Sequence, residues 1–387
     1  MKAKKILISL TEFNAGGVER ALVDLLSQSV FDDCDITVCL VSSGGNWEAQ
    51  IPRKVKIRQI NFDRFLWKWA YAKKDNRSLK NYIGRAYRKF VAEIAGIPKM
   101  YQIALSNVEK DPNVYDVAMD FTGYGSITTA YIADKTDARK KISWVHDEKM
   151  TWLENVKGWL SSYDYVVAVS QKCENIYMQQ FGEYNRNVKV MYNFEQIKRI
   201  ERLSNQTSDE IKMPSIVTVG RISHQKGIDI AISAAKILAE KNVEFYWYCI
   251  GEGPEMDLCK KMIGDYDLYD RVYLVGKKDN PYPYMNQADI YVQPSRHEGW
   301  GIAVDEAGIF GKKMIVSDLS AIQERYAEDK GVVCVPCKAE EVAEAVENAL
   351  ENPLTKEQEQ VFAKLRKNSI ESRNQKSNQV LRELLEV

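Results

Sequence analysis

The strongest constraint on the fold is an alternation of short apolar runs with longer helical stretches, in two successive series along 387 residues. The short runs lack a strict apolar and polar alternation, as strands buried on both faces should. Strands that alternate with helices form parallel sheets covered on both faces. The pattern therefore predicts an α/β chain with two doubly wound domains. We expect strands at residues 5–10, 36–41, 55–60, 115–121, 141–145, 165–169 and 188–192, and then at 215–220, 245–250, 272–275, 290–292, 314–316 and 332–335.

A polar segment separates the two series and predicts the domain boundary. Residues 194–213 are rich in charged and amide side chains, which indicates a linker. We expect a first domain over residues 1–193 and a second domain over residues 214–370. A helix over about residues 371–387 is expected to pack back on the first domain. In doubly wound sheets ligands bind at the carboxyl ends of the strands, so we expect the ligand in a cleft between the two domains.

The overall charge excludes one class of partner. Lysine plus arginine equals aspartate plus glutamate, at 54 each, so nucleic acid is not the expected ligand. The first ten residues are too short in their apolar part for a signal peptide, and no run approaches the roughly 18 apolar residues of a membrane span. Seven scattered cysteines suit a reducing compartment. We expect a cytoplasmic protein.

Two carboxylates, Glu298 and Glu306, flank a Gly-x-Gly turn formed by Gly299, Trp300 and Gly301. The preceding strand would bring Glu298 to the carboxyl edge of the sheet, and Glu306 would lie two turns into the following helix. Free N–H groups at the start of a helix bind anions. Two acids around an anion site are what binding of a sugar nucleotide would require.

Two more loops join a strand to a helix. In the first domain the adjacent glycines Gly16 and Gly17 allow close approach to a bound group, although the dinucleotide fingerprint is absent. In the second domain Arg221 and Lys226 form a cationic pair suited to a diphosphate. His146 ends a strand and is expected to point from the first domain into the cleft.

A basic and aromatic segment covers residues 64–90, with nine lysines or arginines against one acid. Tryptophan, tyrosine and phenylalanine are interleaved with these cations, a mixture typical of surfaces that lie on anionic lipid. The alternative is a solvated basic helix whose aromatic residues belong to the core. We favour membrane contact, with the candidate residues Arg64, Trp67, Lys68, Trp69, Lys73 and Lys74.

These motifs together resemble family 4 glycosyltransferases. The resemblance rests on residues 16–20, residues 219–221 with 225–227, residues 250–254, and the pair Glu298 and Glu306. It covers nearly the whole chain and is most specific in the second domain. It implies a retaining enzyme with the GT-B fold of two Rossmann-like domains, in which residues 1–193 lie on the acceptor side and residues 214–370 bind the nucleotide sugar.

The resemblance also implies a role for each matching residue. Arg221 and Lys226 would hold the donor diphosphate, Glu298 would contact hydroxyls of the transferred sugar, and Glu306 would bind the ribose. His146 would touch the sugar. The implied catalytic residues are Glu298, His146, Arg221 and Lys226. The implied donor-binding residues are Gly16, Gly17, Arg221, Lys226, Gly276, Lys277, Glu298, Gly299, Trp300, Gly301, Ile302 and Glu306.

The implied chemistry needs no metal or cofactor. Negative charge accumulates on the leaving nucleoside diphosphate, and two cations with a helix N-terminus would stabilise it. Family members are thought to react on one face of the sugar, with the leaving phosphate taking the acceptor proton, so Glu298 is not expected to be a nucleophile. The chain departs from the family at Trp300, where phenylalanine is usual, and at Ile222-Ser223, where leucine is common. Both departures bear on donor fit more than on reaction type.

The resemblance favours one function over two alternatives. We expect transfer of a hexose or N-acetylhexosamine from a nucleoside diphosphate sugar, with UDP as the expected nucleotide, to a lipid-linked glycan. Capsule or another surface polysaccharide is the expected product, made at the inner face of the cell membrane. A GT-B epimerase or phosphorylase is disfavoured by the carboxylates and cations together. A non-catalytic sugar-nucleotide-binding partner of a glycosylation complex remains a third hypothesis.

Overall fold

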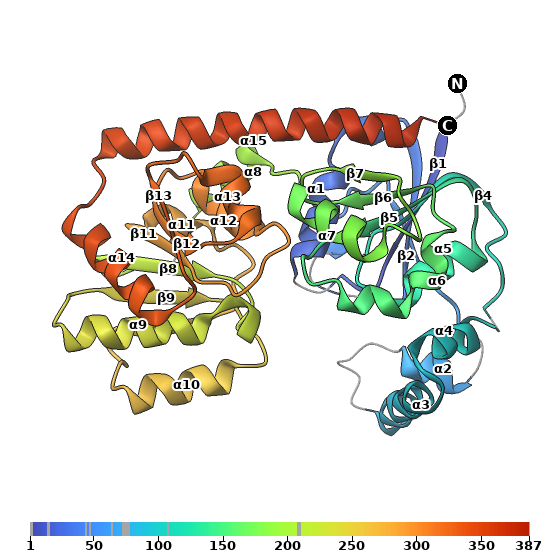
Figure 1. Ribbon diagram of the computed structural model, residues 1–387, viewed down its shortest axis with the longest axis horizontal. Coiled ribbons are helices and arrows are strands. Elements are labelled where there is room, and N and C mark those ends of the chain that lie inside the picture. Colours follow the sequence, from blue (N-terminus) through green and yellow to red (C-terminus); the bar gives the residue numbers. More distant parts are fainter. Residues whose placement is uncertain are drawn as a thin grey trace. The chain divides into compact units, whose positions relative to one another are not determined.

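The computed structural model describes residues 3–13, 16–42, 45, 48–62, 65–71, 78–106, 108–206 and 210–386 (Figure 1). The chain forms two compact units. The first contains Met1–Phe194 and Gln375–Val387, and the second contains Glu195–Asn374. Each unit is a parallel sheet covered by helices, which confirms the expected α/β architecture with two doubly wound domains.

The first unit is built on a seven-stranded sheet with the order β3-β2-β1-β4-β5-β6-β7. Its strands pair in parallel throughout the described residues, for example with Ile6 opposite Ile36 on one side and Val117 on the other. The strands are β1 (Lys4–Leu10), β2 (Cys34–Leu40), β3 (Lys56–Gln59), β4 (Val114–Asp120), β5 (Asp137–Val145), β6 (Tyr165–Ala168) and β7 (Val188–Val190).

The helices of this unit include an insertion between β3 and β4. The helices are α1 (Gly17–Leu26), α2 (Phe65–Ala70), α3 (Leu79–Ala95), α4 (Ile97–Leu105), α5 (Ile127–Lys135), α6 (Lys157–Leu160) and α7 (Gln171–Phe181), with short 3-10 helices η1 (Ser29–Phe31), η2 (Glu48–Gln50) and η3 (Thr151–Asn155). Within the insertion, Gly84 lets α3 approach α2 closely, because a Cβ there would lie 2.5 Å from the backbone nitrogen of Ala70.

The second unit is built on a six-stranded sheet with the order β10-β9-β8-β11-β12-β13. Its strands are β8 (Ser215–Val219), β9 (Tyr246–Ile250), β10 (Val272–Gly276), β11 (Ile290–Gln293), β12 (Lys313–Ser317) and β13 (Val332–Val335). Its helices are α8 (Ile197–Ser204), η4 (His224–Lys226), α9 (Ile228–Glu240), α10 (Met256–Asp265), α11 (Tyr282–Gln287), α12 (Ile302–Gly308), α13 (Ser320–Tyr326) and α14 (Ala339–Glu351). Helix α15 (Lys356–Leu385) belongs to the second unit up to Asn374 and to the first unit from Gln375.

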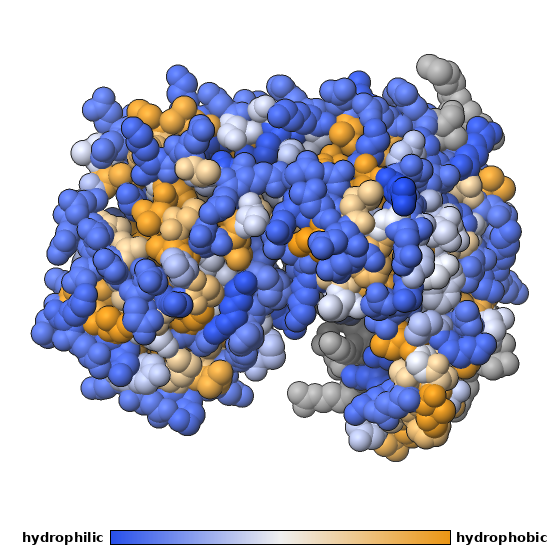
Figure 2. Space-filling model, in the orientation of Figure 1, coloured by the Kyte–Doolittle hydropathy of each residue, from blue (hydrophilic) through white to orange (hydrophobic). Residues whose placement is uncertain are grey.

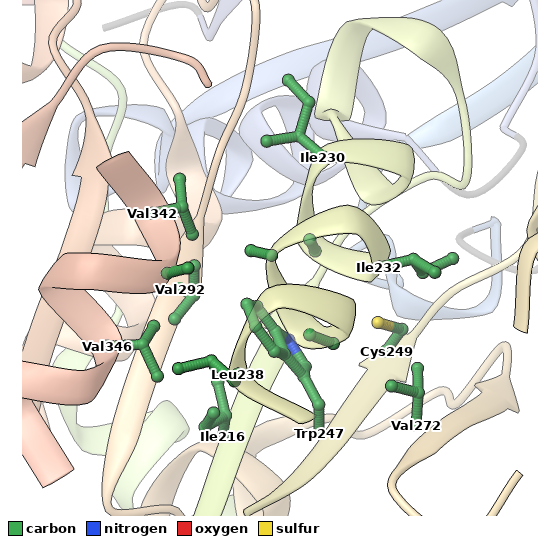
Figure 3. Packing of buried hydrophobic residues seen from close by; sticks show 14 of the residues in the cluster. Ile216, Ile230, Ile232, Leu238, Trp247, Cys249, Val272, Val292, Val342 and Val346 are labelled. Atoms are coloured by element: carbon green, nitrogen blue, oxygen red, sulfur yellow. The ribbon is translucent and has the colours of Figure 1, made fainter. Parts of the chain in front are cut away.

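One core of the second unit lies between the sheet and the helices α9 and α14 (Figure 3). Trp247 fills its centre, and its indole Nε1 donates to Thr218 Oγ1 at 3.0 Å. Leu238 from α9 and Val346 from α14 pack beside it and are fully buried. The apolar faces of these helices are therefore buried against strands that have apolar residues on both faces, as the sequence pattern predicts.

Each expected strand is present, most with bounds shifted by one or two residues, and two regions differ more. Strand β5 begins at Asp137 rather than at residue 141. Its first four residues are mostly polar and are exposed or partly buried, so the apolar run that predicts the strand begins later. The segment expected as a linker, residues 194–213, contains helix α8, whose Ile200 is fully buried in the second unit. No helix in the described part of the chain combines the length and the apolar composition needed to cross a membrane.

Gly227 marks the closest approach of two loops that follow β8 and β11. Its φ of 66° lies in the left-handed region, and a Cβ there would lie 1.9 Å from the carbonyl oxygen of Pro294. Both the backbone conformation and the space therefore require glycine.

The substitution Gly227→Ala is expected to lower the free energy of unfolding by about 3 kcal/mol through strain and backbone displacement. Thermal and urea denaturation measure the change. Gly158→Ala in α6 is the matched control, since a Cβ at that position meets nothing within 4 Å. Equal stability of the two variants would contradict the argument.

Candidate functional site

The loops after β8 and β11 meet at the point where the sheet of the second unit reverses its strand order. From β8 the sheet continues to β9 and β10, and from β11 it continues to β12 and β13. The backbone N–H of Arg296 donates to the carbonyl of Gln225 at 2.7 Å, and the Gln225 amide donates to the carbonyl of His297 at 3.2 Å. Ligands of doubly wound sheets bind at such a reversal.

The ion pair between Lys226 and Glu298 joins these two loops. Lys226 Nζ lies 2.6 Å from Glu298 Oε1 and 2.8 Å from Oε2. Ser295 Oγ also donates to Oε1 at 2.7 Å, and Glu298 is buried. The sequence assigned these two side chains to different parts of the donor, and the structure makes them one hydrogen-bonded group. Ser295 is a supporting residue that the sequence reasoning missed.

Three glycines bring the ends of β8, β9 and β10 close together. A Cβ at Gly251 would lie 1.8 Å from the carbonyl oxygen of Gly220, and the Gly251 N–H donates to the carbonyl of Gly276 at 2.9 Å. Arg221 follows Gly220 and its side chain is exposed at this edge. Gly276 and the half-buried Lys277 therefore lie at the same edge of the sheet as Arg221, at the end of the edge strand β10.

The helix predicted after the Gly-x-Gly turn is α12. It begins at Ile302, and Gly301 precedes it in the left-handed region with φ 82° and ψ 57°. Glu306 lies in its second turn and is 7% exposed. Tyr282 Oη donates to Glu306 Oε1 at 2.7 Å, which fixes the carboxylate. Tyr282 comes from α11 and could not be identified from sequence spacing alone.

The side chain of Trp300 faces the interior of the second unit. The ring is 2% exposed, and the guanidinium carbon of Arg325 lies 4.1 Å from its centroid. Trp300 was expected among the donor-binding residues, and its burial corrects this expectation for the indole. Gly299 is buried beside it in the same loop. A donor contact at these two positions is therefore restricted to the backbone.

In the first unit, the expected glycines begin helix α1. Gly16 and Gly17 are exposed, and the N–H of Arg20 donates to the carbonyl of Gly16 at 3.2 Å. They follow β1, whereas His146 follows β5, so both sites lie at the carboxyl edge of the same parallel sheet. The strand order of this sheet reverses between β1 and β4.

His146 is held as a neutral imidazole. Its Nε2 lies 2.8 Å from the carbonyl oxygen of Phe121, so this nitrogen carries the proton and donates. The ring packs edge-to-face on Phe121 with centroids 4.9 Å apart. Burial lowers the pKa of His146 from 6.5 to about 4. At neutral pH its Nδ1 is an acceptor suited to a hydroxyl, and the ring carries no charge.

Asp120, which ends β4, is a buried carboxylate that the sequence reasoning did not single out. Burial raises its pKa to about 6, even though Thr128 and Thr129 donate to it at 2.7 and 2.6 Å. Ser9 of β1 donates to it as well, at 3.3 Å. These bonds tie the strand ends at the reversal of the first sheet to the start of α5.

The structure corrects the membrane prediction at Trp67. This side chain is 1% exposed and packs on Tyr71 and Tyr87 between α2 and α3. It is a core residue of the insertion, because Gly84 brings the two helices together. Lys68 is exposed and Trp69 is partly buried. Arg64, Lys73 and Lys74 lie outside the described residues.

Comparison with known proteins shows a family similarity in the second unit. Residues 200–370 match the family model Glycosyl transferases group 1. Alpha-D-kanosaminyltransferase of Streptomyces kanamyceticus is 28% identical over 182 residues, and the match covers 41% of this chain and 47% of that enzyme. An uncharacterized glycosyltransferase of Haemophilus influenzae is 24% identical over 356 residues, or 88% of each chain. Amylovoran biosynthesis glycosyltransferase AmsK of Erwinia amylovora is 33% identical over 133 residues, 32% of this chain and 33% of that one.

Solved structures share the fold of the whole chain. Alr3699/HepE of Anabaena, solved in complex with UDP and glucose, has a TM-score of 0.67 and 16% identity, covering 98% of this chain and 100% of that chain. TarM of S. aureus has a TM-score of 0.69 and 13% identity, covering 99% and 100%. Residues 200–370 are thus similar to the group 1 glycosyl transferases, the fold of the whole chain is of the GT-B type, and proteins similar to this chain include glycosyltransferases of polysaccharide biosynthesis.

The neutral state of His146 predicts how stability depends on pH. Between pH 6.5 and 4 the unfolded chain binds a proton at residue 146 and the folded chain does not, so stability falls as the pH falls. Relative to His146→Gln, the wild type is expected to lose about 2 kcal/mol between pH 7 and pH 5. The raised pKa of Asp120 acts in the opposite direction, but both proteins contain it, so it cancels in the comparison. Urea titrations at several pH values measure the difference, and a constant difference would contradict a buried neutral histidine.

Proposed function

We propose that this chain, with its glycosyl transferases group 1 domain, is a retaining glycosyltransferase that uses a nucleoside diphosphate sugar. The donor is a UDP-linked hexose or N-acetylhexosamine, and the acceptor is a hydroxyl of a lipid-linked glycan in capsule or another surface polysaccharide. The observation that carries the proposal is the Lys226 and Glu298 pair at the sheet reversal, with Glu306 on the helix that follows.

The second unit has the groups that such a donor needs. Glu306 is fixed by Tyr282 and can accept hydrogen bonds from two ribose hydroxyls. Lys226 directs two hydrogen bonds to Glu298, and the third donor of its ammonium suits a phosphate oxygen. The exposed Arg221 adds a guanidinium that can hold a phosphate with two bonds. A UDP complex of HepE and one of TarM, both of this fold, support the choice of nucleotide.

The proposed chemistry places bond-breaking assistance on the cations. As the glycosidic bond breaks, the diphosphate gains negative charge that Arg221, Lys226 and the N–H groups of Gly301 and Ile302 stabilise. The sugar is transferred on the face that the diphosphate leaves, and the leaving phosphate takes the acceptor proton. Glu298 orients Lys226 and the sugar hydroxyls, while the neutral His146 accepts a hydrogen bond from the sugar. No metal is required for these steps.

Two substitutions separate donor binding from catalysis. Glu306→Ala is expected to raise the donor KM by roughly 10- to 100-fold, because it removes charge-assisted hydrogen bonds to the ribose. Arg221→Ala is expected to lower kcat by roughly 100-fold, because it removes a cation from the leaving group. Release of nucleoside diphosphate from a panel of nucleotide sugars gives both constants. The exposed Glu240→Ala in α9 is the control, and wild-type kinetics in the two test variants would reject the assignment.

The same assay distinguishes the two alternative functions. Slow release of nucleoside diphosphate without acceptor indicates an enzyme that transfers sugar to water. Tight binding without any release would favour a non-catalytic sugar-nucleotide-binding partner. An epimerase would convert the sugar without releasing nucleoside diphosphate beyond a trace.

We also propose that α3 brings the protein to an anionic membrane surface, where a lipid-linked acceptor would lie. Apolar residues project from one exposed stripe of this helix, and Figure 2 shows hydrophobic surface over it. Four of them are more than half exposed, namely Leu79, Tyr82, Phe90 and Ile94. Their spacings of three, eight and four residues place them on one face of the helix. The neighbouring exposed lysines Lys80 and Lys89 favour anionic lipid.

The triple substitution Tyr82→Ser, Phe90→Ser and Ile94→Ser is expected to reduce binding to vesicles of phosphatidylcholine and phosphatidylglycerol at least about tenfold. Flotation at several salt concentrations measures binding, and vesicles of phosphatidylcholine alone are expected to bind weakly. The pair Leu258→Ser and Tyr269→Ser, which changes exposed apolar residues of the second unit, is the control. Absence of wild-type binding to anionic vesicles would contradict the membrane proposal. A wild-type dimer that the triple variant loses would show that the stripe is a protein–protein interface instead.

A further inference from the structure

Side chains from three distant segments of the second unit hold the loop of residues 294–301 at Trp300. Arg325 from α13 stacks on the indole and donates from Nη2 to the Trp300 carbonyl. Arg373 from α15 lies over the same ring, with its guanidinium carbon 5.5 Å from the centroid. The indole Nε1 donates to Glu195 Oε1 at 3.2 Å. We refer to Glu195, Arg325 and Arg373 as the Trp300 clamp.

A buried carboxylate holds the two arginines of the clamp in place. Asp305 is 0% exposed, and its Oδ2 lies 2.6 Å from Arg325 Nη1 and 3.1 Å from Arg373 Nη2. Burial acts to raise the pKa of Asp305, but the two guanidiniums outweigh it and hold the pKa below its ordinary value. Asp305 directly precedes Glu306 on α12. The same short helix therefore carries the centre of the clamp and the carboxylate proposed for the ribose.

Two members of the clamp lie where the chain passes from one unit to the other. The chain enters the second unit at Glu195 and leaves it after Asn374. These two points are bonded to each other, since the Glu195 N–H donates to Asn374 Oδ1 at 3.3 Å and Asn374 Nδ2 donates to the Glu195 carbonyl at 3.0 Å. Glu195 and Arg373 thus connect both crossing points to Trp300.

Glu195 is suited to a neutral, fully buried position in this cluster. Burial, and then the negative charge of Asp305, raise the pKa of Glu195 well above its usual range. Within the described residues, Oε2 of this side chain receives no hydrogen bond from a donor. A proton on Glu195 lets it bond to Asp305 instead. Its Oε1 remains the acceptor for Trp300.

We propose that Glu195 and Arg373 are positioning residues. They set the conformation of the loop of residues 294–301 from the two points where the chain crosses between the units. The inference rests on the proposed function, because it assumes that the donor binds beside Glu298 and Gly301. Neither residue touches the donor in this mechanism. A displacement of either crossing segment reaches Glu298 through Trp300, since the stacked and hydrogen-bonded indole moves with the clamp.

Hydrogen exchange of the ligand-free protein tests this connection. Arg373→Met and Glu195→Ala are expected to accelerate exchange of the amides of residues 298–302 by roughly tenfold, because each leaves a buried polar group unsatisfied. Arg366→Met is the matched control: Arg366 also lies buried in α15, but it bonds to Asp329 and to the Lys312 carbonyl. It is expected to accelerate exchange near residues 312 and 329 and to leave residues 298–302 as in the wild type. Similar exchange at 298–302 in the two arginine variants would overturn the proposal.

The conservative variant Glu195→Gln separates positioning from general destabilisation. Its amide can donate to Asp305 and accept from Trp300, so exchange at residues 298–302 is expected to return to the wild-type rate. Titration with UDP adds a functional measurement: the alanine variant is expected to bind roughly tenfold more weakly than the glutamine variant. If the wild type binds no UDP or other nucleoside diphosphate, the proposed function fails, whereas the exchange experiment still decides whether the clamp controls the loop.

Discussion

The site of the second unit depends on the parallel pairing of β8 with β11. This pairing places two loops that are more than 70 residues apart in sequence at one edge of the sheet, where Gly227 contacts the Pro294 carbonyl. Any side chain at position 227 would push the loops apart. The close contact is what allows a lysine from one loop and a glutamate from the other to form a partly buried ion pair. The chemistry proposed here follows from that backbone geometry.

Buried charges of the two units are stabilised in different ways. Glu298 is buried beside Lys226, and Asp305 is buried beside two arginines that hold its pKa below the ordinary value although burial acts to raise it. Asp120 is held by hydroxyl groups and by the backbone of Thr122, and burial raises its pKa to about 6. His146 has one carbonyl partner, and it is neutral. The carboxylates paired with cations therefore lie in the unit proposed to bind the charged donor, while the uncharged histidine suits recognition of sugar hydroxyls.

Much of the fold could be predicted, because strands buried on both faces leave a direct trace in the sequence. The proximity of Lys226 and Glu298 could also be predicted from the sequence, because the carboxyl ends of parallel strands lie at one edge of the sheet. The Trp300 clamp could not be predicted from the sequence, because Glu195 and Arg373 are far from Trp300 along the chain and only tertiary packing brings them together. The aromatic residues of segment 64–90 likewise did not reveal that Trp67 is buried. Its burial results from the close approach of α2 and α3 at Gly84. Helix α8 was hidden by its polar composition, although Ile197, Ile200 and Leu203 have helical spacing.

The path of α15 has a consequence for the order in which the protein can fold during synthesis. Its last residues belong to the first unit, where Leu381, Leu384 and Leu385 are buried and Lys4 Nζ bonds to the Leu385 carbonyl at 2.8 Å. The first unit emerges from the ribosome early, but thirteen of its residues are translated after the entire second unit. An N-terminal fragment ending near residue 194 would therefore leave the surface that these leucines cover open to water. The first unit reaches its complete core only after residues 375–387 have been translated.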